Sequence, residues 1–420
     1  RVTQTPPCWP VRLNCWGKSK VLSSKQREYL ANCSHRWNVK TGATRSGKTW
    51  LDLLVTIPKR LLACRGEGLI VLLGNTKGTL ERNILDPMRE LWGPDLVGTI
   101  GSNNTVQLFG RKCYALGADN KKHVARIQGA AFEYCYGDEV TTWSEDVFQM
   151  LKSRLSCPHS HFDGTCNPDS PLHWFKAFLD SDADLYCQAY TIDDNPFLDS
   201  SFVDNLKREY AGTVFYQRFI LGQWAIAEGL VYPFVAANPD AYLLRGPTAG
   251  MDGRFYVSVD YGTHNPCSMG LWCVQRDRAL RIKERYYDSR KTRSQHTPEE
   301  DYAMLEDLAR GYYIQAVVVD PAAAAFIETI RRHGRFLVRP AENDVINGIQ
   351  TTAALLQSGR VLIHESCADT LREFKTYSWD DTAHQDKVIK ENDHAMDDIR
   401  YFCMTVLARE YRWADWRRNV

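Results

Sequence analysis

The chain has 420 residues, of which 44% are hydrophobic and 25% are charged, and its formal net charge is +1. These values are typical of a globular protein with roughly two or three domains, and the absence of any apolar run of about 18 residues argues against a membrane-spanning helix or a membrane partner. The near-neutral charge provides no general attraction for nucleic acid, but it does not exclude DNA, because Lys and Arg can gather in one channel.

The first half of the chain alternates predicted strands and helices, which indicates an α/β fold with a parallel sheet. Strands are expected at about 36–41, 68–73, 132–136 and 160–165, a hairpin at 105–116, and helices at about 48–57 and 80–91. Pro58 is expected to break or kink the first of these helices.

Residues 42–49 read Gly-Ala-Thr-Arg-Ser-Gly-Lys-Thr, a complete phosphate-binding loop between a predicted strand and a predicted helix. Glycines let backbone N–H groups turn toward an anion, and the amino terminus of the following helix faces it. We therefore predict an ATP site in which Lys48 reaches the β- and γ-phosphates and Thr49 binds Mg²⁺. The predicted nucleotide contacts from this loop are Gly42, Arg45, Ser46, Gly47, Lys48 and Thr49.

Asp138 and Glu139 follow the predicted strand 132–136 and supply the second half of the ATP site. Asp138 is expected to hold the Mg²⁺ through water, and Glu139 to orient the attacking water as the catalytic carboxylate. Glu133 and Gly137 interrupt the apolar run of this strand, so an exposed acidic turn is the alternative interpretation.

Several other polar residues are candidates for the same site. Thr165 and Asn167 end the next predicted strand, where they could sense the γ-phosphate, and Gln26 is either an adenine contact or a solvated side chain. Arg45, within the loop, and Arg126, about a dozen residues before the acidic pair, are both candidates for an arginine finger, in cis or from a neighbouring subunit. The alternative for Arg126 is an ion pair with a nearby carboxylate.

The 13 cysteines include no Cys-x-x-Cys pair, and we interpret them as reduced. One cluster could be drawn as a zinc site: Cys157, His159, His161 and Cys166. Its spacing matches no usual zinc finger, and we interpret the two histidines as alternating along a strand edge instead.

Proline and glycine residues punctuate 229–253, and we place an interdomain linker there. The predicted domains are 1–228, with an N-terminal arm and a linker subdomain, and 254–420, with a short C-terminal tail. In the second domain, three strands are followed by alternating helices and strands, the element order of a ribonuclease-H-like sheet. Strands are expected at 255–260, 268–274, 280–287, 316–320, near 336 and near 361, and helices at about 298–310, 323–332, 345–356 and 394–408.

Three aspartates occupy the positions that a ribonuclease-H-like nuclease requires. Asp260 and Asp320 each end a predicted strand, and Asp397 lies early in the last predicted helix. A single Asp at a strand end is often only a turn or cap residue, but three in this topological order are harder to dismiss. Two-metal phosphodiester hydrolysis needs carboxylates that converge on ions about 4 Å apart, and we predict that these three bind Mg²⁺ or Mn²⁺.

The neighbours of Asp397 have more than one interpretation. Asp398 would point about 100° away from it on a helix, and we interpret it as a bystander. Asp393 and His394 are expected to cap the helix, with assistance by His394 at the metal centre as the alternative. Lys387 and Lys390 are either contacts to DNA phosphates or solvated side chains.

With these motifs in place, the chain resembles the large terminase subunit of tailed bacteriophages over about residues 25–410. The segments that carry the resemblance are 42–49, Asp138-Glu139, Gly-Thr-Cys-Asn-Pro at 164–168, residues 221–233 and Asp-His-Ala-Met-Asp-Asp-Ile-Arg-Tyr at 393–401. The resemblance implies a P-loop ATPase domain followed by a ribonuclease-H-like, resolvase-type nuclease domain. It also implies that Arg126 acts in trans.

The resemblance further implies a viral genome-packaging motor that uses ATP and Mg²⁺, with Mn²⁺ able to replace Mg²⁺ in the nuclease. Such a motor translocates double-stranded DNA into a procapsid and cuts concatemeric DNA endonucleolytically. The implied partners are a small terminase subunit, a portal protein and further copies of the chain in a ring, with a monomeric state in isolation left open. The implied location is the host cell cytoplasm rather than the mature virion. The alternative is a DNA translocase or helicase-like ATPase whose second domain only binds.

Overall fold

The computed structural model describes residues 22–120, 122, 129–262, 265–276, 278–381 and 386–408. The chain divides into two compact units. The N-terminal unit comprises Arg1–Pro168 and Trp174–Ser200, and the C-terminal unit comprises Asp169–His173 and Ser201–Val420. Within the described ranges, no helix combines the length and the apolar character needed to cross a membrane. The functional domain ranges 1–228, 229–253 and 254–420 stay predictions.

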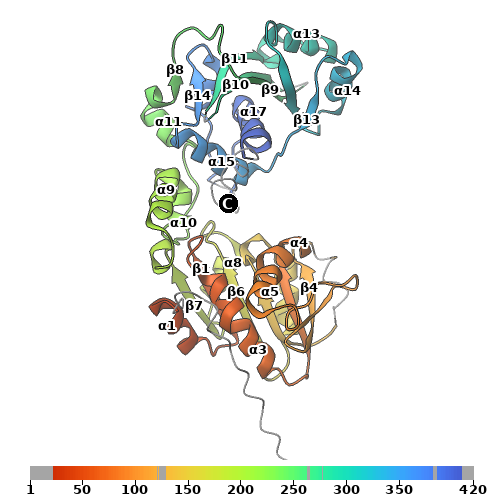
Figure 1. The fold of residues 1–420 in the computed structure, drawn as a ribbon, viewed down its shortest axis with the longest axis vertical. Coiled ribbons are helices and arrows are strands. Elements are labelled where there is room, and N and C mark those ends of the chain that lie inside the picture. Colours follow the sequence, from red (N-terminus) through yellow and green to blue (C-terminus); the bar gives the residue numbers. More distant parts are fainter. Residues whose placement is uncertain are drawn as a thin grey trace, which may run out of the picture. The chain divides into compact units, whose positions relative to one another are not determined.

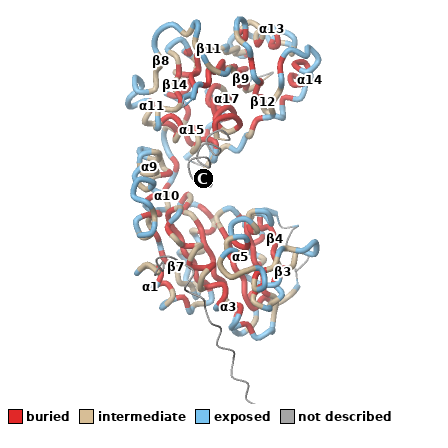
Figure 2. Tube along the Cα trace, in the orientation of Figure 1, coloured by how far each residue is buried: buried red, intermediate tan, exposed pale blue. Residues whose placement is uncertain are grey.

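A seven-stranded sheet in the order β3-β4-β2-β5-β6-β1-β7 forms the centre of the N-terminal unit (Figure 1). Every neighbouring pair is parallel except β3 with β4. The central strands are buried along their length, as expected for a parallel sheet covered on both faces (Figure 2). The strands are β1 Trp37–Gly42, β2 Leu69–Gly74, β3 Thr105–Leu108, β4 Arg111–Gly117, β5 Phe132–Gly137, β6 His161–Cys166 and β7 Leu185–Tyr190.

The helix after the phosphate-binding loop continues past Pro58, where the sequence predicted a break or kink. It runs through α2 (Lys48–Leu51), a π-helical turn (Asp52–Thr56) and α3 (Ile57–Ala63). A proline removes one backbone donor and crowds the preceding turn, and a wider π-helical turn is a local adjustment that accommodates this inside a helix. The same order of an α-helix, a π-helical turn and a second α-helix recurs around Pro87, in α4 (Lys77–Leu80), Glu81–Leu85 and α5 (Asp86–Trp92). The other α-helices of the unit are α1 Ser24–Asn32, α7 Glu145–Arg154 and α8 Trp174–Leu179.

Strand β5 forms although two of its residues look unsuitable for a buried strand. The Glu133 carboxylate accepts hydrogen bonds from backbone N–H groups of the loop 65–67, with Gly66 N and Glu67 N each 3.0 Å from Oε2. At Gly137, a Cβ would lie 2.7 Å from Phe162 and 2.7 Å from Trp143, so close packing excludes any side chain there. Both apparent interruptions are therefore structural requirements of the strand that leads to Asp138.

The C-terminal unit also has a seven-stranded sheet, in the order β13-β12-β9-β10-β11-β14-β8 (Figure 1). Three consecutive strands, β9, β10 and β11, form an antiparallel meander, and β12 pairs with β9 in parallel. Strand β8, which lies inside the predicted linker 229–253, pairs with β14. The strands are β8 Leu243–Leu244, β9 Arg254–Asp260, β10 Cys267–Val274, β11 Ala279–Tyr287, β12 Ile314–Val319, β13 Val338–Pro340 and β14 Val361–His364.

Helices cover both faces of this second sheet, and alternate strand residues point to opposite cores. Tyr256 belongs to a core shared with α15 and α17, whereas Val257 belongs to one shared with α13 and α14. On the α17 side, the rings of Trp272 and Phe402 stack at 4.1 Å between centroids. Ser258 and Asp260, in phase with Tyr256, therefore face α17. The α-helices from Ser200 onward are α9 Ser200–Tyr210, α10 Val214–Phe219, α11 Pro233–Ala237, α12 Ser289–Thr292, α13 Pro298–Leu308, α14 Ala324–His333, α15 Val345–Gln357, α16 Ala368–Glu373 and α17 His394–Phe402.

Candidate functional site

Most of the residues predicted to bind nucleotide line a cavity of about 600 Å³ in the N-terminal unit, whereas Gly42 and Thr165 do not line it. The cavity lies at the carboxyl end of β1, where the phosphate-binding loop leads into α2. The structure thus brings together side chains that are far apart in the sequence. The predicted residues in its wall are Gln26, Arg45, Ser46, Gly47, Lys48, Thr49, Asp138, Glu139 and Asn167.

The loop backbone depends on two glycines and one strained arginine. Gly42 has a φ of 139°, and a Cβ there would lie 2.1 Å from the carbonyl oxygen of Tyr190, so only glycine permits β7 to approach. Gly47 has a φ of 87° and precedes α2. Arg45 also adopts a left-handed conformation, with a φ of 57°, which is unfavourable for a side chain with a Cβ. Asn195 stabilises it by donating a hydrogen bond of 2.7 Å to its carbonyl oxygen.

The Lys48 ammonium is buried within the loop. It donates hydrogen bonds to the carbonyl oxygens of Gly42 at 2.8 Å and Ala43 at 2.6 Å, and to Asn167 Oδ1 at 3.2 Å. Burial lowers the pKa of Lys48 to about 8, and the negative charge of Glu139 acts in the opposite direction. The loop thus keeps a cationic donor at the cavity wall without a directly bound carboxylate.

Asp138 and Glu139 lie directly after β5 and face the same cavity. Thr165 Oγ1 donates to Asp138 Oδ1 at 3.2 Å, and Asn167 Nδ2 donates to Glu139 Oε2 at 2.9 Å. Burial raises the pKa of Asp138 to about 7, with repulsion from Glu139 adding to the shift. Burial also raises the pKa of Glu139, against the attraction of Lys48. Asp138 is 3% exposed, which excludes the alternative of an exposed acidic turn.

The remaining candidates in this unit have different outcomes. Gln26 donates to the carbonyl oxygen of Gly47 at 3.0 Å and accepts from the backbone N–H of Ser23 at 2.9 Å, so it joins the start of α1 to the loop. Its role as an adenine contact stays a prediction. Arg45 lines the cavity, and Arg126 lies outside the described residues, so the arginine finger stays a choice between the two.

In the C-terminal unit, Asp260 ends β9 and Asp320 follows β12 directly. Because β9 and β12 are parallel neighbours, their carboxyl ends lie at the same edge of the sheet. The Tyr401 hydroxyl on α17 lies 3.0 Å from Asp320 Oδ2 and 3.4 Å from Asp260 Oδ1, and it donates to these carboxylates. The structure therefore brings the first two predicted metal ligands together, as the ribonuclease-H-like topology requires.

His394, the first residue of α17, contacts the same carboxylate. Its Nδ1 lies 2.7 Å from Asp260 Oδ2. Burial raises the pKa of Asp260 to about 6, while the hydrogen bond from His394 acts to lower it. For His394 itself, burial lowers the pKa, but the hydrogen bond with Asp260 outweighs this and the net shift is upward. The hydrogen bond thus favours the charged form of both side chains, against the effect of burial.

The third predicted ligand, Asp397, is bonded to two cationic side chains. Arg400 donates to its Oδ1 from Nη2 at 3.0 Å, and Lys390 Nζ lies 3.2 Å from its Oδ2. Across the described ranges, no group of three or more His, Cys, Asp or Glu side chains is arranged to hold a metal ion, and this includes the zinc candidates around Cys157. Carboxylate oxygens are nevertheless the donors that Mg²⁺ and Mn²⁺ prefer, so the chemistry of Asp260, Asp320 and Asp397 fits either ion.

Asp398, which the sequence suggested to be a bystander, forms the centre of a buried network. Its carboxylate pairs with the Arg281 guanidinium on β11, with 3.0 Å between Nη2 and Oδ2, and accepts a hydrogen bond of 2.8 Å from Ser258 on β9. Both charged side chains are fully buried. A Cβ at Gly270 would lie 1.8 Å from Arg281, so the absence of a side chain on β10 makes room for the guanidinium. This network fixes the face that α17 turns toward the sheet.

The amino terminus of α17 is held separately by Glu373, the last residue of α16. Glu373 Oε2 accepts hydrogen bonds from the backbone N–H groups of Ala395 at 2.7 Å and Met396 at 3.4 Å. A carboxylate at this end also interacts favourably with the helix dipole. Glu373 and Asp398 together position Asp397 and His394 relative to Asp260.

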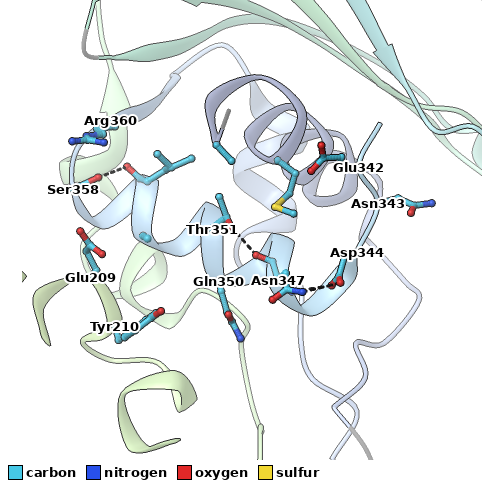
Figure 3. A pocket seen from close by; sticks show the side chains of 14 residues that line it. Glu209, Tyr210, Glu342, Asn343, Asp344, Asn347, Gln350, Thr351, Ser358 and Arg360 are labelled. Carbon is cyan, nitrogen blue, oxygen red and sulfur yellow. Dashed lines mark hydrogen bonds between the residues drawn. The ribbon is translucent and has the colours of Figure 1, made fainter. Parts of the chain in front are cut away.

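A second cavity, of about 740 Å³, lies beside α15 in the same unit (Figure 3). None of the three aspartates lines it. It adjoins them through Asn343, whose Nδ2 lies 3.5 Å from Asp320 Oδ2. The carboxylates therefore belong to the strand ends and α17 rather than to this cavity.

Sequence reasoning missed several residues that hold these sites together. Tyr401 follows Asp397 by four residues, so it lies one helical turn further along the same face, and this spacing was a usable signal. Asn195, Glu373 and the Arg281 partner of Asp398 are distant in sequence from the residues they contact. No local pattern marks them.

A phosphate-binding loop facing the acidic pair Asp138–Glu139 in one unit, and paired aspartates on a ribonuclease-H-like sheet in the other, define a two-domain P-loop protein with a nuclease-type second domain. Comparison with known families gives two matches: "Terminase large subunit, T4likevirus-type, N-terminal" over residues 41–238 and "Terminase RNaseH-like domain" over residues 257–405. The chain belongs to the terminase large subunit family.

Similar proteins agree with this assignment. The large terminase of a thermophilic bacteriophage, solved in complex with ADP, is 31% identical, with a TM-score of 0.81 over 92% of this chain and 100% of that chain. The same protein in complex with ATP-gamma-S gives the same identity, coverage and TM-score. The large terminase subunit of Escherichia phage T5 is 23% identical over 292 residues, and the match spans 65% of this chain and 65% of that curated relative.

Proposed function

We propose that the protein is the motor and nuclease of a viral genome-packaging machine. ATP hydrolysis in the N-terminal unit would drive double-stranded DNA into a procapsid, and Asp260, Asp320 and Asp397 would cut concatemeric DNA with Mg²⁺ or Mn²⁺. The observation that carries the proposal is that one chain holds a complete, internally bonded phosphate-binding site and, on a separate sheet, two aspartates at adjacent parallel strand ends.

In the ATP site, we assign the phosphate contacts to Lys48 and to the backbone N–H groups of the loop at the start of α2. Asn167 contacts both Lys48 and Glu139, with bonds of 3.2 Å and 2.9 Å. A γ-phosphate that attracts the ammonium would therefore also affect the carboxylate that orients water. Thr49 and Asp138 are the proposed Mg²⁺ ligands. The ADP and ATP-gamma-S complexes of the thermophilic phage relative support nucleotide as the ligand of this cavity.

In the nuclease site, a bound divalent ion would activate water and stabilise the leaving oxygen. Asp260 and Asp320 would bind it from the sheet and Asp397 from α17. His394, which contacts Asp260 at 2.7 Å, would orient that carboxylate and hold a proton at Nδ1. Tyr401 would keep the two strand-end carboxylates close before the ion binds.

The proposed partners follow from membership of the family. They are double-stranded DNA, a small terminase subunit, a portal protein and further copies of this chain in a ring, in the cytoplasm of the infected host cell. Grip on DNA should come mainly from phosphate contacts, so it should tolerate any sequence and weaken with salt. Arg45 in cis or Arg126 in trans would supply the arginine finger.

Two variants test the assignment of the two activities. ATP turnover and plasmid cleavage with Mg²⁺ or Mn²⁺ are measured for the full chain, for Glu139→Gln and for Asp260→Asn. We expect Glu139→Gln to lose ATP turnover and keep cleavage, and Asp260→Asn to lose cleavage and keep turnover. Undiminished cutting by Asp260→Asn would refute the nuclease site. DNA-stimulated ATP turnover without cutting under either metal would favour a translocase whose second domain only binds.

A further inference from the structure

Lys390 lies on the loop that leads into α17, close to the carboxylates of that helix. The loop follows Val388, which forms a β-bridge with Trp379. The Lys390 ammonium is 3.2 Å from Asp393 Oδ2 and 3.2 Å from Asp397 Oδ2. Lys390 therefore contacts an oxygen of Asp397, a residue that we propose as a metal ligand.

The two cations on Asp397 differ in how firmly they are held. The Arg400 side chain is 3% exposed and also donates to the carbonyl oxygen of Asn343 at 2.7 Å, so it is fixed in the protein interior. The Lys390 side chain is 56% exposed and reaches Asp397 from a loop. The carboxylates of Asp393 and Asp397 are only 5% and 9% exposed, but the ammonium end of the pair is open to solvent, and an exposed lysine pays side-chain entropy to stay in one geometry. Lys390, not Arg400, is the exchangeable partner.

We propose that Lys390 is an internal counter-cation of the nuclease site, which occupies Asp397 Oδ2 in the metal-free protein and leaves it when a divalent ion binds. This inference rests on the proposed function of the three aspartates. Binding of the ion at Asp397 then becomes an exchange of one cation for another. The exchange lowers the apparent metal affinity and couples binding of the ion to movement of the loop before α17.

Two consequences separate this role from a contact to DNA phosphates, the interpretation that the sequence also allowed. A counter-cation competes with metal in the absence of DNA, whereas a phosphate contact does not. A counter-cation is also protected from amine-modifying reagents until metal displaces it, whereas a phosphate contact is protected by DNA.

The first test is a calorimetric titration of Mn²⁺ into the full chain, without DNA or nucleotide and at low salt. Asp260→Asn identifies the heat that belongs to the nuclease site. We expect Lys390→Met to bind Mn²⁺ about three- to fivefold more tightly at that site, a range that matches the upper part of the strength of exposed ion pairs. Lys390→Arg should stay near wild type.

The matched control is Lys387→Met, which removes the same charge from the same loop three residues earlier. It should change Mn²⁺ affinity by less than about twofold, because only screened, long-range repulsion is lost. Equal Mn²⁺ affinities for Lys390→Met and Lys387→Met would overturn the proposal. Weaker DNA binding by Lys390→Met in EDTA, with Mn²⁺ affinity unchanged, would overturn it in favour of the phosphate contact.

The second test follows acetylation of individual lysines by mass spectrometry, again without DNA. We expect Mn²⁺ to increase the modification rate of Lys390 and to leave Lys387 unchanged, and an unchanged rate at Lys390 would contradict the exchange. An error in the metal site and an error in the role of Lys390 would give different results. If wild-type protein shows no Mn²⁺ binding that depends on Asp260, the metal site itself is wrong; if such binding exists but Lys390→Met does not strengthen it, only the counter-cation is wrong.

Discussion

The key charged side chains of the two proposed sites have opposite kinds of bonding partner. In the N-terminal unit, the cationic Lys48 is bonded to neutral groups, namely two backbone carbonyls, the Ser46 hydroxyl and the Asn167 amide. In the C-terminal unit, the anionic Asp397 is bonded to full charges, those of Lys390 and Arg400. Neutral partners leave the charge of Lys48 available to a phosphate, whereas ionic partners must be given up before Asp397 can bind a metal.

This difference indicates that the proposed ATP site can receive a charged ligand without breaking an ion pair, whereas the proposed metal site would have to rearrange. A preorganised polar site requires little reorganisation when its charged ligand arrives. When a site is neutralised by its own side chains, the protein avoids the cost of an uncompensated buried charge. The same ion pairs lower the affinity of the site for a metal ion. Four measurements test this difference between the two sites.

The largest expected effect is on ATP turnover in Glu139→Gln. Removing a positioned carboxylate that activates water should lower kcat by about 10²–10⁴-fold, while the amide keeps the bond to Asn167 and nucleotide binding persists. Steady-state turnover and nucleotide titration measure the two quantities. Glu145→Gln, at an exposed position on α7, is the control and should behave as wild type. Equal turnover in the two variants would show that Glu139 is not part of the prepared site.

The next effect is on the stability of the C-terminal unit in Arg281→Met. Loss of the guanidinium leaves Asp398 as an uncompensated buried charge, which should lower the free energy of unfolding by about 3–5 kcal/mol. Hydrogen exchange of the amides of α17 measures it. Arg285→Met removes an exposed arginine of the same strand that pairs with Asp307, and it should cost about 0–1 kcal/mol. Similar losses in both variants would contradict the claim that the Asp398 network fixes α17.

A smaller effect is expected for Gly137→Ala behind the ATP site. The new methyl group would overlap Phe162 and Trp143, so overpacking should destabilise the N-terminal unit by about 1–3 kcal/mol and weaken nucleotide binding. Thermal unfolding and nucleotide titration test this. Gly78→Ala is the control, because the nearest atom to its Cβ is 3.8 Å away and alanine favours the helix there. A stable Gly137→Ala protein would mean that the site tolerates movement of β5.

The smallest effect is the pH dependence of Mn²⁺ binding. Burial raises the pKa of Asp260 to about 6, so this carboxyl keeps its proton to a higher pH than usual and protons compete with metal below that value. Affinity should fall by about tenfold per pH unit below about 6 and level off above it, because metal ligands must be deprotonated. The hydrogen bond with Asp260 raises the pKa of His394, so the imidazolium adds positive charge beside Asp260 at acidic pH. A flat titration between about pH 5 and about pH 7 would contradict this description.

The sequence predicted most strands of both sheets, and the strand ends that carry the candidate site residues, because those signals are local. The phosphate-binding loop is contiguous, and Asp260 and Asp320 directly follow apolar strand runs. What it could not predict depends on contacts between distant residues. Asp398 looked like a bystander because its partner Arg281 is 117 residues away, and Glu133 looked like an interruption because its partners are in the loop 65–67. The helix continued past Pro58 because a π-helical turn, which has no sequence signature, precedes it.

The chain passes between the two units three times, because Asp169–His173 belongs to the C-terminal unit although the residues on either side do not. This excursion begins two residues after Asn167, and Asp169 is held there by Arg218 at 3.0 Å and by the backbone N–H of Ala225 at 3.2 Å. Truncation at a single position therefore cannot separate the two units. A truncated product that ends before Arg218 would keep every motif of the ATP site but lose the anchor beside Asn167, so its enzymology would not report on the intact chain.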